Sequence, residues 1–152
     1  MTRSGSPPRV LPPHYLATAV LTVVALGLWS GGGLLPAPWP YLGVLLIVPG
    51  IVLAARGSRQ FARAGTNIIP LTESNTLVRD GVFRLSRNPM YLGMLAALVG
   101  VALLANTAWA WPVVGAFFLV IRQGFVLKEE ALLLETFGDD YLNYQSTVRR
   151  WL

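Results

Sequence analysis

Cysteine is absent from the 152-residue sequence, and histidine occurs once, as His14. The lack of cysteine excludes disulfide bonds, thiolate nucleophiles and cysteine metal sites. A lone histidine near the N-terminus is more typical of an interfacial residue than of a metal ligand. Because the sequence also contains no GxGxxG, P-loop or metal-ligand pattern, it predicts neither a metal site nor a soluble nucleotide-binding fold.

Charged residues are scarce as well, at 12% of the chain, whereas about 25% is usual in soluble proteins. Apolar residues make up 54%, and the mean hydropathy is +0.55. The apolar residues gather in four runs, separated by proline-rich, basic and tryptophan-containing connections, and such runs predict helices that span a membrane. The predicted spans cover residues 14–35, 41–55, 90–105 and 109–127.

The charged residues lie in three places: the tail 1–13, the segment 56–89, and the chain from Arg122 onward. The connections 30–40 and 106–111 carry no charge, so four spans place every charged segment on one side of the membrane. By the positive-inside rule that side is cytoplasmic. We therefore expect an integral protein of the cell (inner) membrane with cytoplasmic N- and C-termini. The net charge of +5 then reflects orientation, and no nucleic-acid partner is expected.

The predicted domain organisation is a disordered Pro/Ser-rich cytoplasmic tail over 1–13, followed by a single domain over 14–152. A signal peptide over the first apolar run is a weaker alternative, because no clear small-x-small cleavage site follows it. The last two spans form a short helical hairpin. The fold class is therefore all-α, as a polytopic membrane protein of about four transmembrane helices.

The segment from 128 to 150 shows the clearest helical periodicity. Apolar and aromatic residues recur there at steps of three and four, which places them on one face of a helix. We expect an amphipathic cytoplasmic helix that lies along the bilayer interface, with Gly138 as its weak point. The residues of this face are Leu133, Phe137, Tyr141, Tyr144, Val148 and Trp151.

Two segments hold most of the polar residues, "ESNTLVRDGVFRLSRNPMYLG" (73–93) and "KEEALLLETFGDDYLNY" (128–144). Ionisable groups at a membrane boundary are costly when they face lipid, so we expect these segments to face each other. Simpler local roles are also open. Asn88 and Pro89 are a good N-cap and first helical residue, Tyr91 suits an aromatic belt, and the acidic pair Glu129-Glu130 suits a solvated turn.

In combination these motifs resemble a known family. The stretch "GTNIIPLTESNTLVRDGVFRLSRNPMYLG", followed by an apolar hairpin and "EEALLLETFGDDYLNYQSTVRRW", is similar to the isoprenylcysteine carboxyl methyltransferase superfamily, which includes the phospholipid N-methyltransferases. The resemblance covers about residues 60–152. It implies a membrane methyltransferase that uses S-adenosyl-L-methionine and acts, in the lipid bilayer, on a lipid, lipidated or small hydrophobic methyl acceptor.

The resemblance also implies site residues. It implies catalytic roles for Arg87 and Tyr91. Where the eukaryotic enzyme has an arginine for the substrate carboxylate, this sequence has Phe125, and Arg122 about one turn earlier is the substrate candidate. This departure weakens the case for a prenylcysteine carboxylate, and the acceptor stays open between carboxylate, amine and thiol. The cofactor-binding positions implied are Asn75, Thr76, Leu77, Val78, Phe83, Asn88, Pro89, Met90, Tyr91, Glu129 and Glu130.

The residue chemistry agrees with methyl transfer, which needs positioning more than acid–base catalysis. Glu129 can hold cofactor hydroxyl or amino groups, and Arg84 or Arg87 can hold its carboxylate. Asn88 stands where histidine is common, and an amide cannot titrate, so no proton transfer can rest on it. Two alternatives are an NADPH-dependent enzyme like the steroid reductases and a non-catalytic scaffold that binds anionic lipid headgroups.

Overall fold

The computed structural model describes residues 10–31, 33–65 and 76–152. Within these ranges the chain forms helices and no strand, which confirms the all-α prediction. The tail predicted over 1–13 falls mostly outside the described residues, and the first helix begins at Pro12. The elements are α1 (Pro12–Ser30), η1 (Trp39–Gly43), α2 (Val44–Arg63), η2 (Gly81–Arg84), α3 (Pro89–Ala105), α4 (Ala110–Ile121), η3 (Arg122–Val126), α5 (Leu127–Phe137) and α6 (Asp139–Thr147).

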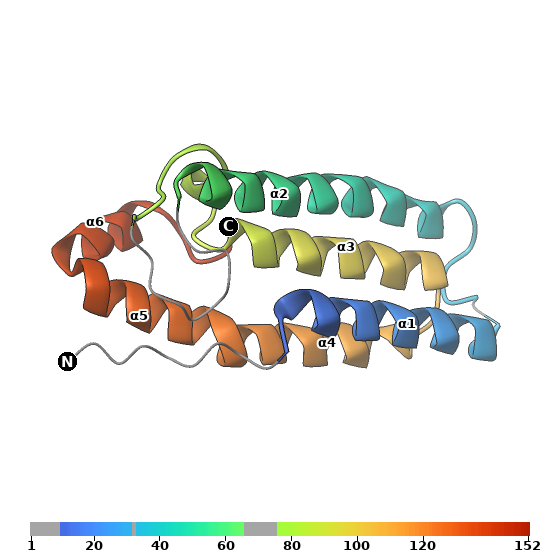
Figure 1. Cartoon of the computed structure of the whole chain (residues 1–152). Coiled ribbons are helices and arrows are strands. Elements are labelled where there is room, and N and C mark those ends of the chain that lie inside the picture. Colours follow the sequence, from blue (N-terminus) through green and yellow to red (C-terminus); the bar gives the residue numbers. More distant parts are fainter. Residues whose placement is uncertain (1–9, 32, 66–75) are drawn as a thin grey trace.

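Four apolar helical segments run alongside one another (Figure 1). Three are long and apolar enough to cross a membrane, namely Pro12–Ser30, Trp39–Arg63 and Ala110–Phe137. The fourth, Pro89–Ala105, is shorter; its 17 residues rise by about 26 Å. The chain is thus a polytopic membrane protein, as the composition predicts.

Glycines bring α2 and α3 into close contact. Gly50 faces Gly93 across the two helices, and a Cβ atom built on Gly50 would lie 2.6 Å from the carbonyl oxygen of Gly93. Gly43, the last residue of η1, faces Gly100 of α3 in the same way. Small residues let helix backbones approach where no hydrophobic effect drives association in lipid, so these pairs fix how α2 and α3 pack.

The uncharged connections meet at one end of the bundle, where Asn106 ties them together. Asn106 ends α3 in the left-handed conformation, with φ 52°. Its side-chain amide donates to the carbonyl of Leu35 at 2.9 Å and accepts from the Leu35 N–H at 2.7 Å. Nearby, the Ser30 hydroxyl donates to the Thr107 hydroxyl at 2.9 Å. The described parts of the charged segments that follow α2 and α4 lie at the opposite end, with α5 and α6 (Figure 1).

Helix ends differ from the apolar runs in two places. The run predicted over 14–35 is helical only to Ser30, because Gly31 adopts a left-handed conformation (φ 72°) that ends α1. The run predicted over 41–55 continues as helix to Arg63. Arginine is a good helix former and its long side chain reaches water from a helix end, so the charges do not end α2.

The single helix expected over 128–150 is instead two helices. The first, α5, continues from α4 through η3, which is a π-helical turn. The break falls at Gly138, whose φ of 50° and ψ of −121° lie in a region that favours glycine. The apolar face of these helices does not lie on lipid: Tyr141 and Tyr144 are buried, and Leu133, Phe137 and Val148 pack against their cluster.

Candidate functional site

A pocket opens at the charged end of the bundle, between the start of α3 and helices α5 and α6. Its cavity volume is about 50 Å³, well below the roughly 300–1,000 Å³ that is usual for small-molecule sites, so a ligand of that size requires the lining side chains to move apart. Fifteen residues line it: Phe61, Thr76, Leu77, Val78, Phe83, Arg87, Asn88, Pro89, Met90, Tyr91, Glu129, Glu130, Leu133, Tyr141 and Tyr144.

Tyr91 and Glu129 join the two polar segments across this pocket. Pro89 occupies the first turn of α3, where its missing N–H leaves no donor unsatisfied, and Tyr91 follows two residues later. Its ring is only 4% exposed, and its hydroxyl donates to a carboxylate oxygen of Glu129 at 2.8 Å. The ring also packs against Phe125, with 6.4 Å between ring centroids. Phe125 therefore supports the pocket wall from η3.

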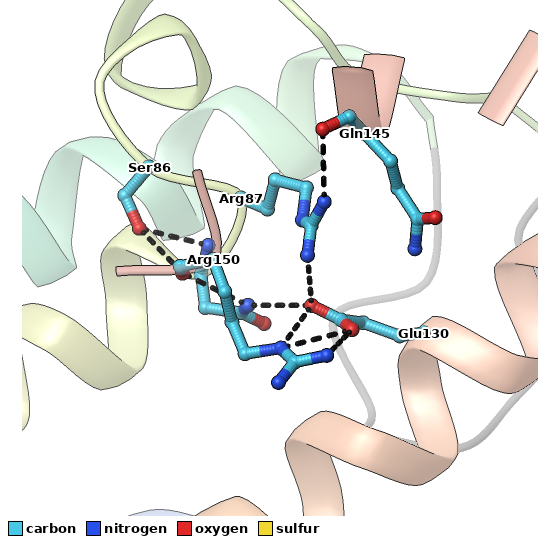
Figure 2. Close-up of polar contacts among 6 residues, drawn as sticks. Ser86, Arg87, Glu130, Gln145 and Arg150 are labelled. Carbon is cyan, nitrogen blue, oxygen red and sulfur yellow. Dashed lines mark hydrogen bonds and ion pairs between the residues drawn. The ribbon is translucent and has the colours of Figure 1, made fainter. Parts of the chain in front are cut away.

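Glu130 has a different environment from its neighbour, because two guanidinium groups hold it (Figure 2). Arg87 donates to its carboxylate at 3.1 Å, and Arg150 donates through Nε and Nη2 at 3.0 and 2.8 Å. The side chains of Arg87 and Glu130 are only 10% and 8% exposed. Charge-assisted bonds of this kind are strong and directional, so Glu130 is a fixed point of the site.

The segment that carries Arg150 docks against the start of α3 through its backbone. The N–H of Arg87 donates to the carbonyl of Arg149 at 3.0 Å, and the Ser86 hydroxyl donates to that of Arg150 at 3.1 Å. The side-chain amide of Asn88 donates to the Arg150 carbonyl at 3.2 Å and to Glu130 at 3.4 Å. Asn88 stands at the N-cap position but makes no side-chain cap bond, so its polar groups serve the site.

Aromatic rings form the other wall of the pocket. The rings of Phe61 and Phe83 lie 4.9 Å apart between centroids, and the Tyr144 hydroxyl donates to the Phe83 carbonyl at 2.6 Å. Burial raises the pKa of Tyr144, which keeps this hydroxyl protonated and therefore a donor. Burial also raises the pKa of Tyr141. The rings are tilted against each other, by 42° for Phe61 and Phe83 and by 56° for Tyr141 and Tyr144, so this wall presents both ring faces and ring edges to an aromatic ligand.

Most of the residues that the sequence predicts for the site line this one pocket. Asn75 falls outside the described residues. Arg84 is exposed and pairs with Asp80 at 2.9 Å, while Arg122 is not part of the pocket lining. Neither of these arginines reaches the pocket, because Arg84 lies on the outer side of η2 and Arg122 lies two turns before the acidic pair.

Sequence reasoning missed five residues of the site. Their signal was present for three of them, because Leu133, Tyr141 and Tyr144 belong to the periodic face that we assigned to the bilayer surface. The other two come from segments whose approach to the pocket no local pattern reveals. The five are Phe61, Leu133, Tyr141, Tyr144 and Arg150.

The pocket suits a ligand with polar groups and a flat ring. Among the described residues, two buried polar atoms have no hydrogen-bond partner, Nε of Arg87 and the hydroxyl of Tyr141, and both residues line the pocket. Buried polar atoms without partners are rare and call for an explanation, and a polar ligand provides one. No group of His, Asp or Glu with metal-binding geometry occurs in the described part of the chain.

Comparison with known proteins identifies the family. A model of the family described as phospholipid methyltransferase matches residues 39–140, which include α2, α3 and the helical segment that carries Glu129 and Glu130. The chain belongs to the phospholipid methyltransferase family. In this family member, the matched residues include every residue that lines the pocket except Tyr141 and Tyr144.

Relatives extend the similarity beyond the family model. Protein-S-isoprenylcysteine O-methyltransferase A of Arabidopsis thaliana is 32% identical over 112 residues, which are 70% of this chain and 55% of the plant protein. Protein-S-isoprenylcysteine O-methyltransferase of Mus musculus is 30% identical over 146 residues, 84% of this chain and 49% of the mouse protein. The chain therefore spans about half the length of these two relatives.

An uncharacterized protein of Haemophilus influenzae is 43% identical over 63 residues, which are 41% of this chain and all of that protein. No solved structure matches the chain significantly.

Proposed function

We propose that this family member transfers a methyl group from S-adenosyl-L-methionine to a lipid, lipidated or small hydrophobic acceptor. The observation that carries the proposal is the contact between Tyr91 and Glu129 at 2.8 Å. It joins the two polar motifs on which the family resemblance rests, at a pocket lined by both. Family membership over residues 39–140 supports the same reaction.

The residues of the pocket divide into two groups with different chemistry. The aromatic and apolar wall around Phe61, Phe83 and Tyr141 suits the adenine ring of the cofactor, and Leu77 and Val78 extend that wall. The opposite wall offers Arg87 for a carboxylate, and Glu129 for hydroxyl or amino groups. We assign Thr76, Asn88, Pro89 and Met90 to the same cofactor site; the role of Asn75 rests on the family resemblance alone.

S-adenosyl-L-methionine supplies an electrophilic methyl group on a sulfonium. The chain contributes position and environment, which is what an in-line displacement requires. Tyr91 and Glu129 hold each other at the membrane end of the pocket, and Phe125 excludes water behind them. Because Arg122 lies outside the pocket lining, we propose no carboxylate-binding role for it, and Arg87 and Tyr91 remain the candidates to contact the reacting groups.

The acceptor would approach from the bilayer, since the pocket lies beside apolar helices that span it. We further propose that the charged end of the bundle is cytoplasmic. The basic residues at the end of α2, Arg56, Arg59 and Arg63, are exposed there, while the opposite connections carry no charge. This asymmetry follows the positive-inside rule.

Calorimetry on the full chain in lipid nanodiscs tests the proposal. Titration with S-adenosyl-L-methionine should show saturable binding, and NADPH should not. Glu129→Gln should weaken binding because the carboxylate is lost while the side-chain shape is kept. Transfer of labelled methyl groups in native membranes, followed by isolation of the labelled product, then identifies the acceptor. Binding of NADPH in place of S-adenosyl-L-methionine would overturn the proposal.

A further inference from the structure

The adjacent residues Arg149 and Arg150 direct their side chains differently. Arg149 contributes its backbone carbonyl, which accepts from Arg87, while its side chain is exposed. The side chain of Arg150 is 34% exposed and turns inward to Glu130 (Figure 2). The sequence "VRRW" does not distinguish the two residues, but the structure does.

Arg150 binds the carboxylate of Glu130 without lining the pocket itself. Its Nε lies 3.0 Å from both carboxylate oxygens, and its Nη2 lies 2.8 Å from one of them. Arg150 itself is absent from the residues that line the pocket, whereas Glu130 and Arg87 are present. Arg150 thus touches the pocket only through another residue.

In the described part of the chain, two of the three guanidinium nitrogens of Arg87 have hydrogen-bond partners, and the third has none. One guanidinium nitrogen of Arg87 donates a hydrogen bond to Glu130, and another donates to the Gln145 carbonyl at 3.3 Å. Its Nε is buried without a partner among the described residues. One carboxylate shared between two guanidiniums leaves a net positive charge in the cluster, and that charge is available to an anionic group of a ligand in the pocket.

We propose that Arg150 is a positioning residue for the cofactor site. It fixes the carboxylate of Glu130, which in turn holds Arg87 and Asn88 in place and leaves the unpaired N–H of Arg87 for the ligand. Without Arg150, Glu130 has a single cationic partner and pairs with Arg87 more completely, which removes the net charge. This inference rests on the proposed use of S-adenosyl-L-methionine.

The geometry of the side chain matters as well as its charge. A guanidinium binds a carboxylate through two parallel N–H donors, whereas an ammonium is a point charge on a flexible stem. Lysine at position 150 therefore preserves the charge of the cluster but not the orientation of Glu130. Arginine and lysine should differ at this position, which a purely electrostatic role would not predict.

Binding of S-adenosyl-L-methionine to the full chain in nanodiscs tests the inference. We expect Arg150→Ala to weaken binding about tenfold, which corresponds to about 1.4 kcal/mol, and Arg150→Lys to recover only part of this loss. Arg149→Ala is the matched control, because it keeps the backbone carbonyl and removes an exposed side chain; its binding should equal that of the wild type. Millimolar guanidinium should partly restore Arg150→Ala, since the site of the lost group is partly open to water.

The outcomes separate the two proposals. If the wild type binds and Arg150→Ala binds equally well, or if Arg149→Ala loses as much as Arg150→Ala, the positioning role is wrong and the proposed function stands. If the wild type does not bind S-adenosyl-L-methionine, the proposed function fails and this role fails with it. Melting temperatures distinguish loss of folding from loss of binding. Should Arg150→Ala not fold, Arg150→Lys takes its place, and wild-type affinity in that variant overturns the role.

Discussion

The hydroxyl of Tyr91 donates to Glu129 at 2.8 Å across 38 residues of chain. No local sequence pattern predicts this contact, because Tyr91 follows a basic loop at the start of α3 and Glu129 lies beyond the α3–α4 hairpin. The contact forms because the hairpin returns the chain to the end of the bundle from which it started. Among the described residues, the carboxylate of Glu129 has no cationic partner, whereas that of the adjacent Glu130 has two.

Replacing Tyr91 by phenylalanine tests the use of this contact. The variant keeps the buried ring and removes the donor to Glu129, and a hydrogen bond to a charged group contributes about 1.5–3 kcal/mol. We expect binding of S-adenosyl-L-methionine to weaken by about tenfold or more, measured by calorimetry. Tyr15→Phe is the control, because Tyr15 also packs against Phe125 but does not line the pocket. Equal affinities in the two variants would contradict a role of the Tyr91 hydroxyl.

Glu130→Gln should lower the stability of the chain. The substitution leaves Arg87, whose side chain is 10% exposed, without its anionic partner. Removing one member of a buried ion pair costs about 3–5 kcal/mol; because the Arg150 side chain is 34% exposed, its share is screened by water, and we expect about 2–3 kcal/mol. Denaturant unfolding in detergent measures the change.

Glu135→Gln is the control for that experiment, since Glu135 lies on the same helix, α5, and is exposed. The free energy of unfolding should change there by less than about 0.5 kcal/mol. A loss as large at Glu135 as at Glu130 would show that the effect belongs to helix charge and not to the ion pairs.

Gly50→Ala should destabilise the packing of α2 on α3. The added methyl group would lie 2.6 Å from the carbonyl oxygen of Gly93, so the two helices must separate. Overpacking of this kind costs about 1–3 kcal/mol. Gly115→Ala on α4 makes no contact within 4 Å and should be neutral or stabilising by up to about 1 kcal/mol. Thermal unfolding of the two variants should therefore shift in opposite directions or differ clearly in size.

Two substitutions at Asn106 separate its hydrogen bonds from its backbone conformation. Asn106→Gly removes both bonds to Leu35 and tolerates the φ of 52°. Asn106→Ala removes the same bonds and adds the left-handed strain of about 1–2 kcal/mol. We expect alanine to be the more destabilising of the two in thermal unfolding. Equal effects would mean that the turn relaxes to another conformation.

Sequence reasoning predicted the helical membrane fold well, because span length and charge placement follow directly from the cost of burying polar groups in lipid. It placed α3 to within one residue, because Pro89 and Asn106 mark the two ends of that helix. It also indicated that the acidic pair and the Asn-Pro-x-Tyr motif meet. These are properties that composition and hairpin connectivity determine.

The remainder depended on three-dimensional packing. A periodic face containing Tyr141 and Tyr144 fits lipid and protein equally well as a pattern, and only the approach of Phe83 shows that protein covers it. Similarly, Arg149 and Arg150 differ only in the direction of their side chains. Asn88 has good capping chemistry, yet the carbonyl of Arg150 and the carboxylate of Glu130 compete for its amide. Local capping propensity does not account for hydrogen-bond partners that are so far away in the sequence.

The π-helical turn Arg122–Val126 has a consequence for how this site could change in evolution or by design. Such a turn holds one more residue than a regular one, and each residue of a helix advances by about 100°. The five residues of the turn therefore sweep about the same angle as four residues of a regular helix, so the turn absorbs one extra residue and the helices on either side keep their phase. Deleting one residue there would let the turn close as regular helix and leave both carboxylates facing Tyr91 and Arg87. A further insertion has no wide turn left to absorb it and would rotate both carboxylates by about 100°, which would alter the site without replacing a single pocket residue.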